Sequence, residues 1–303
     1  MQTNNEFSLT VLEMGTHQAG LIYTGEMSQP GALALTRQFE RLFGYYQYPK
    51  IVLSIESPGG ALDGLEYVLR SMMKWSAQGR HVAVRSTFLC ASAGAFLLAM
   101  GAWGERRVDK GTLLLFHNAR IAGASVPQMT ASMTTNISKT LSTVDRSLLD
   151  YLVEKLTREA GGAAQLARTV QMRLEFVDTQ WANVGSKLAT IASGKDGTRK
   201  PAWIKSMFNW AYDDPVKFMT AFKGHLARSF AKDQSFDLAE SYVLCLIDEI
   251  EDVLSDQMER RAAQVTLNVE HDTESGVGLK QVQTGPFAKP HGHCGEPTSM
   301  MNI

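Results

Sequence analysis

Residues 9–116 alternate between short apolar runs and segments with the apolar spacing of a helix, and this alternation restricts the possible folds more than any other feature of the sequence. The run at 51–55 leads into the turn Pro58-Gly59-Gly60, which is typical of a buried strand. The expected strands are 9–12, 21–24, 51–55, 81–84 and 112–116, and the expected helices include 32–43 and 91–100. Strands that alternate with helices build a mainly parallel sheet with helices packed on it. The sequence therefore predicts an α/β fold.

The chain beyond residue 120 is expected to be mainly helical. Apolar residues at helical spacing predict a long helix over about 127–160, and core packing is the simplest explanation of this stripe. Its members are Leu141, Val144, Leu148, Leu152 and Leu156. Changes in composition then divide the chain into segments. We expect a folded domain over 1–193, a polar linker over 194–202, a helical appendage over 203–264 that contains an acidic helix over 238–261, and a disordered tail over 265–303.

Composition argues against several classes of partner. The formal net charge is −1 and the pI is near 6.7, so no bulk attraction to nucleic acid or to an anionic membrane is expected. The N-terminus lacks the basic start and apolar core of a signal peptide, and no apolar run is long enough to span a bilayer. The widely separated Cys90, Cys245 and Cys294 favour a reducing compartment over a disulfide framework. We therefore expect a cytoplasmic protein.

A small cluster near the C-terminus has residue types that bind metals. His291, His293 and Cys294 crowd one short segment without a fourth ligand at suitable spacing, so we interpret them as non-ligating. The pair Arg106-Arg107 is too short a basic run to indicate nucleic-acid binding. The sequence predicts neither a metal nor another cofactor.

Three short elements can together form a nucleophilic site. Ser92 lies at the expected start of a helix, where free backbone N–H groups favour a developing negative charge. His117 follows the strand at 112–116, and a neutral imidazole is the usual base that removes a serine proton. Taken alone, each element has an ordinary explanation: a helix N-cap at Ser92, a hydrogen-bonded histidine at a strand end, and a tight turn at Gly59-Gly60.

The order of these elements resembles a known family. Ser57-Pro58-Gly59-Gly60, the segment from Ala91 to Leu98, and Phe116-His117-Asn118 are similar to the proteolytic subunit of Clp protease and its relatives in the ClpP/crotonase superfamily, and the likeness extends over most of 21–188. The resemblance implies a ClpP/crotonase-like α/β fold and a serine endopeptidase. It further implies that Ser92 is the nucleophile, His117 the general base, and the backbone N–H groups of Gly60 and Ala93 the oxyanion hole.

The same resemblance implies partners. The substrates would be peptides or unfolded proteins, and the chain would assemble with copies of itself, for example in a ring that hides the site. An ATPase partner is compatible with this assembly, although neither the ATPase nor the ring size follows from the sequence. The appendage over 203–264 is not part of the familiar Clp pattern, so it could block a family-like assembly or recruit another partner.

The third member of the site departs from the family pattern. The family's acid precedes a Phe and a Gly, and with Phe176 and Gly185 in those roles the acid would fall near Thr169-Val170, where no carboxylate stands. Glu175 is the nearest candidate and Asp178 is the alternative third acid, each in a shifted register. Either can instead be ordinary surface, and Asp178 also suits a helix N-cap. A Ser-His dyad without an acid stays open.

Three alternative functions stay open. Ser92-Ala93-Gly94 also resembles signal peptide peptidase A and related Ser-Lys peptidases, in which Lys139 would be the alternative base, provided that burial lowers its pKa. A crotonase-type acyl-CoA enzyme would share the oxyanion architecture but not the Ser92/His117 pair. An inactive ClpP-like scaffold or assembly subunit is the non-enzymatic alternative.

Overall fold

The computed structural model describes residues 7–13, 17–119, 131–179, 201–232 and 236–251. Its main sheet has six strands in the order β1-β2-β3-β4-β6-β8. These strands are β1 (Phe7–Glu13), β2 (Gln18–Gly25), β3 (Lys50–Glu56), β4 (His81–Ser86), β6 (Arg106–Asp109) and β8 (Glu249–Glu251). Strand β1 is antiparallel to β2, and every other neighbouring pair of this sheet is parallel. This arrangement confirms the predicted α/β fold.

A second, two-stranded sheet lies beside the first. It pairs β5 (Leu89–Ala91) in parallel with β7 (Leu113–Leu115). Strand β5 is tied to the end of β3, because Ser57 N donates to Leu89 O at 2.9 Å and Ala91 N donates to Ser57 O at 2.9 Å. The small sheet therefore continues the strand ends of the large one.

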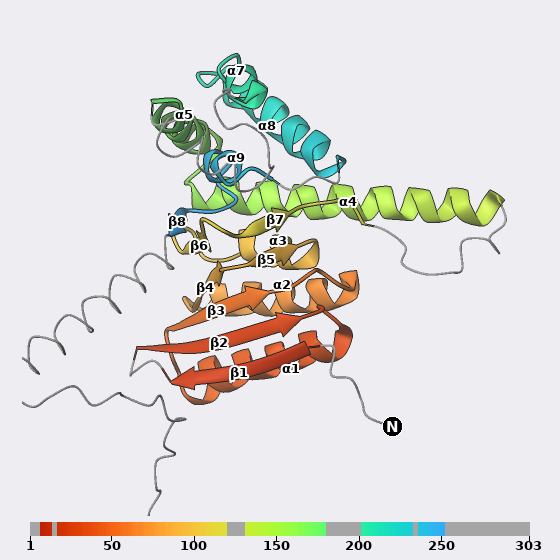
Figure 1. Ribbon diagram of the computed structural model, residues 1–303, viewed down its shortest axis with the longest axis vertical. Helices are drawn as coiled ribbons and strands as arrows, with labels where there is room; N and C mark the ends of the chain where they lie inside the picture. Colours follow the sequence, from red (N-terminus) through yellow and green to blue (C-terminus); the bar gives the residue numbers. More distant parts are fainter. Residues whose placement is uncertain (1–6, 14–16, 120–130, 180–200, 233–235, 252–303) are drawn as a thin grey trace, which may run out of the picture. The chain divides into compact units, whose positions relative to one another are not determined.

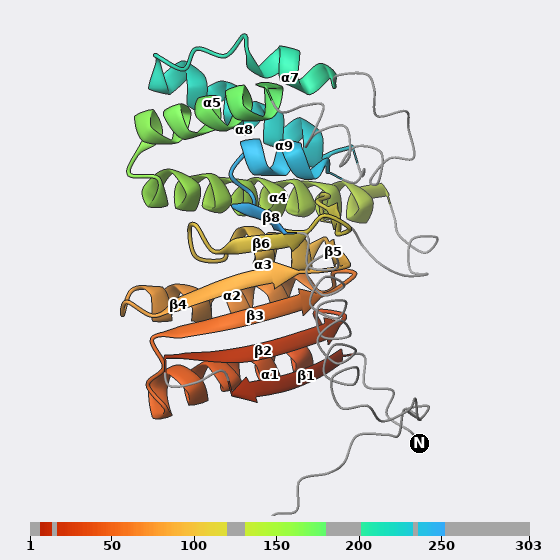
Figure 2. The same cartoon turned by 60° about the vertical axis from the view of Figure 1, so that its left-hand side comes forward.

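Helices cover one face of the sheet and extend the chain beyond it. They are α1 (Gln29–Phe39), continued by a π-helical segment over Glu40–Tyr45, α2 (Leu62–Ser76), α3 (Ala93–Ala99), α4 (Ala131–Glu159), α5 (Ala163–Thr179), α7 (Ala202–Met207), α8 (Pro215–Phe230) and α9 (Leu238–Val243). Figures 1 and 2 show α1 and α2 on the same face of the sheet. Strand β3 follows this layering, since Ile51, Leu53 and Ile55 are buried and the residues between them are half-exposed.

Helix α4 is the longest described helix. Its C-terminal part packs into the core through Leu149, Leu152, Val153 and Leu156. The residues from 135 to 148 are exposed or half-exposed, and this half of the helix extends past the other described elements in Figure 1. None of the described helices combines the length and apolarity that crossing a membrane requires.

The C-terminal segment differs from the acidic helix expected over 238–261. Helix α9 ends at Val243 instead of continuing to 261, because Cys245 has a positive φ of 58° that turns the chain out of the helix. The chain then enters the main sheet as β8, which pairs with β6. Among the described residues, 201–232 and 236–251 share the hydrophobic core of the α/β part. The expected linker up to 200 and the tail from 265 lie outside the described residues.

A buried ion network ties this segment to the sheet. The Arg106 side chain is fully buried and makes two hydrogen bonds of 2.7 Å to the carboxylate of Asp248, which Arg173 also contacts at 3.1 Å. Burial alone would raise the pKa of Asp248, but the hydrogen bonds and charges of Arg106 and Arg173 hold it below its ordinary value. The network therefore links β6, α5 and the start of β8.

Candidate active site

Three strands end at one edge of the structure, and each leads directly into a residue of the predicted site. Strand β3 leads into Ser57–Gly60, β5 leads into Ser92, and β7 leads into His117. Ser92 N donates to Leu115 O at 2.7 Å, which joins the second and third of these strand ends. In parallel α/β sheets, ligands bind outside the carboxyl ends of the strands. The topology therefore brings Gly60, Ser92 and His117 to the usual place for a site.

Ser92 occupies a sharp turn from strand β5 to helix α3. Its backbone has φ 52° and ψ −122°, a strained conformation for a residue other than glycine. Strand-to-helix turns of this kind expose the nucleophilic serine of α/β-hydrolases. A Cβ added to Gly59 would lie 2.5 Å from Ser92 Cβ and 3.0 Å from Ser92 Oγ, so the glycine allows the two backbones to approach closely. Gly59 thus brings the Ser57–Gly60 turn against the serine.

The turn that precedes β5 is held by one carboxylate. Glu56 accepts hydrogen bonds from the backbone N–H groups of Thr87, Phe88 and Leu89 at 2.6 to 3.0 Å. Because Leu89 begins β5, these bonds fix the strand that carries Ser92. This is a positioning contact, and it explains why the strained turn can persist.

Two backbone N–H groups belong to residues next to the Ser92 turn: Gly60 follows Gly59, which approaches Ser92, and Ala93 follows Ser92 itself. Met27 N donates to Gly59 O at 2.6 Å, and Ala61 N donates to Met27 O at 2.8 Å. The carbonyl before Gly60 and the N–H after it therefore both face Met27. The C=O and N–H of one trans peptide unit point in opposite directions, so the Gly60 N–H, which shares a unit with the Gly59 carbonyl, points away from Met27. The Ala93 N–H is the first of helix α3 and has no partner within the helix. These are the two groups that the family resemblance implied for an oxyanion hole.

An aromatic cluster fixes the end of β7. The Phe116 ring packs at 5.0 to 5.4 Å between centroids against Phe96, Phe230 and Phe236. Phe236 N also donates to Leu114 O at 2.8 Å. Because Phe230 belongs to α8 and Phe236 precedes α9, the C-terminal segment helps to hold the strand that carries His117.

These strand ends enclose a cavity of about 410 Å³. Ser92, Ala93, Gly60 and His117 all line it. The other lining residues are Glu26, Pro58, Ala61, Leu62, Leu65, Phe96, Ala119 and Leu148. The structure thus brings together four of the residues that the sequence predicted, in a cavity whose other walls are mainly apolar.

Ser92 and His117 share the cavity without a direct hydrogen bond between their side chains. The His117 ring instead forms a hydrogen bond between its Nδ1 and the carbonyl oxygen of Asn118, at 2.7 Å. A carbonyl oxygen can only accept, so a neutral ring that makes this bond carries its proton on Nδ1 and leaves Nε2 as the acceptor. That tautomer is the one a general base requires, and catalytic hydrogen bonds are often longer before a substrate binds.

The remaining predicted residues lie outside this cavity. Glu175 is exposed on α5, where its carboxylate accepts from Gln171 at 3.0 Å, and Asp178 is half-buried on the same helix. Neither residue lines the Ser92 cavity. Lys139 is exposed on α4 and is also absent from the lining. Gly185, which set the expected register of the acid, lies outside the described residues.

One carboxylate near the site was missed by the sequence reasoning. Asp145 on α4 is half-buried, and its Oδ1 accepts a hydrogen bond of 2.6 Å from the N–H of Ala119. The signal was present in the spacing, because Asp145 lies four residues after Leu141 and three before Leu148, on the same side of the helix as the apolar stripe. A carboxylate at this position interrupts the apolar pattern, and that interruption is the signal.

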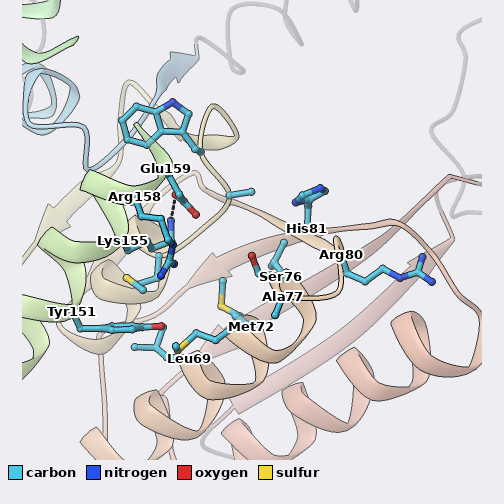
Figure 3. Close-up of a pocket in the computed structure, with 15 residues that line it drawn as sticks. Leu69, Met72, Ser76, Ala77, Arg80, His81, Tyr151, Lys155, Arg158 and Glu159 are labelled. Carbon is cyan, nitrogen blue, oxygen red and sulfur yellow. Dashed lines mark hydrogen bonds and ion pairs between the residues drawn. The ribbon is translucent and has the colours of Figure 1, made fainter. Parts of the chain in front are cut away.

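A second cavity of about 610 Å³ lies at the other end of α2 (Figure 3). Its lining includes Ser76 at the end of α2, His81 at the start of β4, and Tyr151 and Lys155 on α4. The Lys155 ammonium donates to Gly101 O at 2.7 Å and pairs with Glu159. Burial lowers the pKa of Lys155 from 10.5 to about 8, and the Arg106 charge acts in the same direction. This lysine is separate from the Ser92 cavity.

The lowered pKa of Lys155 predicts a dependence of stability on pH. Between pH 8 and 10.5 the unfolded chain binds more protons than the folded chain. The contribution of Lys155 to the free energy of unfolding therefore rises with pH across this window, and it is lost as the pH falls through 8. We expect the free energy of unfolding of the wild type, relative to Lys155→Met, to increase by about 3 kcal/mol over the window. Denaturant unfolding at several pH values measures it, with Lys139→Met as control. A constant difference would contradict the lowered pKa.

The fold and the cavity define a class of protein: an α/β protein that presents a strained serine, a histidine and two backbone N–H groups at the ends of parallel strands. Comparison with family models identifies the family as Clp protease, with a match over residues 4–169, more than half of the chain. The chain belongs to the Clp protease family, which confirms both the resemblance and the ClpP/crotonase-like fold that it implied. A search of curated proteins gave no match. The family membership supports a ClpP-like peptidase in general.

Proposed function

We propose that this protein is a serine endopeptidase in which Ser92 is the nucleophile and His117 the general base. The observation that carries this proposal is the strained backbone of Ser92, at a strand-to-helix turn that opens into the same cavity as His117 and Gly60. Such strain persists only where the surrounding structure enforces it, and it clusters at active sites. Membership of the Clp protease family supports the same reaction class.

The proposed reaction proceeds through an acyl-enzyme. Ser92 Oγ forms a bond to the carbonyl carbon of the peptide while His117 Nε2 takes the hydroxyl proton. The carbonyl electron pair moves to oxygen, and the N–H groups of Gly60 and Ala93 stabilise the resulting oxyanion, each by roughly 3 kcal/mol. Collapse breaks the C–N bond, and His117 gives the proton to the leaving amine. Water then attacks the acyl carbon, and its proton returns through His117 to Ser92.

The walls of the cavity suggest which peptides fit. Leu62, Leu65, Phe96 and Leu148 offer apolar surface beside Ser92, and Glu26 is the carboxylate among the lining residues. An apolar side chain next to the scissile bond would be buried there, which is favourable by about 25 cal/mol per Å² of apolar surface. We therefore propose peptides or unfolded proteins with apolar residues as substrates.

The proposal uses His117 instead of Lys139 as the base. A lysine can serve as a base when burial lowers its pKa, but Lys139 is exposed. Lys155 has a lowered pKa, yet it lines the other cavity. The dyad also needs no contribution from Glu175, since the Asn118 carbonyl already receives the Nδ1 proton. The free, buried thiols of Cys90 and Cys245 agree with a cytoplasmic location.

Incubation with a pool of unstructured peptides tests the proposed activity. Mass spectrometry should detect internal cleavage, with the two products together one water heavier than the parent peptide. Cleavage should favour bonds next to apolar residues. A folded protein that cleaves none of the peptides, at the protein concentration at which it assembles, would favour the inactive scaffold.

We also propose that the chain assembles with copies of itself. The apolar residues Ile137, Leu141, Val144 and Leu148 are half-exposed on the extended half of α4, at a spacing that puts them on one side of the helix. A stripe of this kind buries its surface when a second copy covers it. Analytical ultracentrifugation should give a mass well above the 33.4 kDa of the monomer. Leu141→Lys should shift the distribution towards the monomer, and a strictly monomeric wild type at high concentration would count against assembly.

A further inference from the structure

Two hydrogen bonds near the proposed base share one peptide group. The carbonyl of Asn118 receives the Nδ1 proton of His117 at 2.7 Å, and the N–H of Ala119 donates to the carboxylate of Asp145 at 2.6 Å. The Asn118 carbonyl and the Ala119 N–H belong to the same peptide unit, which is planar and conjugated. The imidazole, the peptide unit and the carboxylate therefore form one continuous chain of hydrogen bonds.

We propose that Asp145 is the acid of this site and acts on His117 through the Asn118–Ala119 peptide group. Asp145 is a positioning residue in this arrangement, because the peptide unit separates it from the reacting atoms. The inference rests on the proposed peptidase function and extends it, since it supplies the third member that neither Glu175 nor Asp178 supplies from the cavity lining.

The physical effect has two parts. A negative carboxylate on the N–H side of a peptide unit increases the electron density on its carbonyl oxygen, and hydrogen bonds in a chain strengthen one another. The Asn118 carbonyl therefore becomes a stronger acceptor for the Nδ1 proton, which favours the tautomer with Nε2 free. When His117 takes the Ser92 proton, the carboxylate also stabilises the positive imidazolium. The proton on Nδ1 stays in place throughout, as it does in a Ser-His-Asp triad.

The surroundings of Asp145 suit this role. Its helix neighbour Leu148 and its hydrogen-bond partner Ala119 both line the Ser92 cavity, so the carboxylate lies just behind the cavity wall. It is half-buried, where charges are screened less than in water. Ala119 provides the backbone N–H that donates to the carboxylate, and a proline at this position would have no N–H to donate.

Asp145→Asn removes the negative charge of the carboxylate but keeps an oxygen that can accept the same hydrogen bond. The amide oxygen can still accept from Ala119 N–H, so the loop after His117 stays anchored. We expect kcat for peptide cleavage to fall about tenfold with KM unchanged, which corresponds to ~1.4 kcal/mol of transition-state stabilisation. Asp145→Ala should lose at least as much. The matched control is Glu154→Gln, which removes a carboxylate from an exposed position of the same helix and should leave kcat unchanged.

A second readout does not depend on activity. Nitrogen NMR of the His117 side chain reports which ring nitrogen carries the proton. The wild type should carry it on Nδ1, and Asp145→Asn should shift neutral His117 towards the Nε2-protonated tautomer. If the wild type cleaves no peptide and the tautomer still shifts in Asp145→Asn, the proposed peptidase function fails. The proposed action of Asp145 on His117 through the peptide group, which we call the relay, then stands. A wild-type kcat and an unchanged tautomer in Asp145→Asn would overturn the relay and leave Asp145 as a loop anchor alone.

Discussion

Replacing Ser92 by alanine is expected to lower kcat for peptide cleavage by ~10⁶-fold, to the residual level that binding and the oxyanion hole provide without a nucleophile. The large loss follows from the mechanism, because no acyl-enzyme can form without Oγ. The fold should persist, since Ser92 makes its fold-stabilising bond to Leu115 through its backbone N–H. Steady-state kinetics on a fluorogenic peptide measures the loss, and the melting temperature checks the fold.

Ser76→Ala is the matched control for this variant. Ser76 is exposed at the end of α2 and lines the second cavity instead of the first. Its replacement should leave kcat at the wild-type value. If Ser92→Ala retains activity, the site lies elsewhere in the chain.

Replacing His117 by alanine is expected to cause a loss of similar size, because the hydroxyl then has no base and the leaving amine has no acid. Lys139→Ala should keep an activity close to that of the wild type. A lysine exposed to water is protonated near neutral pH and cannot accept a proton. Burst kinetics that follow acylation of Ser92 separate this step from the later hydrolysis.

The pair of variants distinguishes two peptidase classes. Loss of acylation in Lys139→Ala with retention in His117→Ala would move the protein to the Ser-Lys class. Loss in both would indicate that α4 and the histidine loop depend on each other. Melting curves of each variant would then show whether the loss comes from unfolding.

The parts of the fold that the sequence predicted are those with strong local patterns. Apolar strands such as 51–55, followed by a glycine turn, specify a parallel sheet because few other folds satisfy that alternation. The order of Gly60, Ser92 and His117 along this pattern led to one cavity, since parallel strands place their carboxyl ends at a common edge.

The C-terminal strand was not predictable from local pattern. Cys245 ends α9 with a positive φ, a position where glycine would have marked the turn in the sequence. Strand β8 reads Glu-Ile-Glu, which is too short and too charged to suggest a strand. It pairs with β6, which is distant in the sequence, and Arg107 of that strand contacts Glu249 at 3.2 Å and Glu251 at 2.9 Å. The acidic helix expected over 238–261 was therefore wrong from residue 244 to the end of the described chain at 251.

The proposal of Asp145 as the acid also required the folded chain. Glu175 was favoured on sequence distance alone, and its helix position leaves it exposed beside Gln171. Asp145 is 28 residues from His117 along the chain, and its observed contact in this region is the hydrogen bond from the Ala119 N–H. The spacing along the helix predicts that Asp145 lies on the same side as the apolar stripe, but it does not predict which peptide group the carboxylate contacts.

The most direct measurement of the central claim is labelling of the wild-type protein with a fluorophosphonate, followed by mapping of the adduct by mass spectrometry. The reagent reacts with a serine only when a base and an oxyanion hole activate the hydroxyl. The proposed site predicts one adduct, on Ser92, which disappears in Ser92→Ala and forms much more slowly in His117→Ala. An adduct on another serine, or none on a folded and assembled protein, would contradict the assignment of Ser92 as a nucleophile.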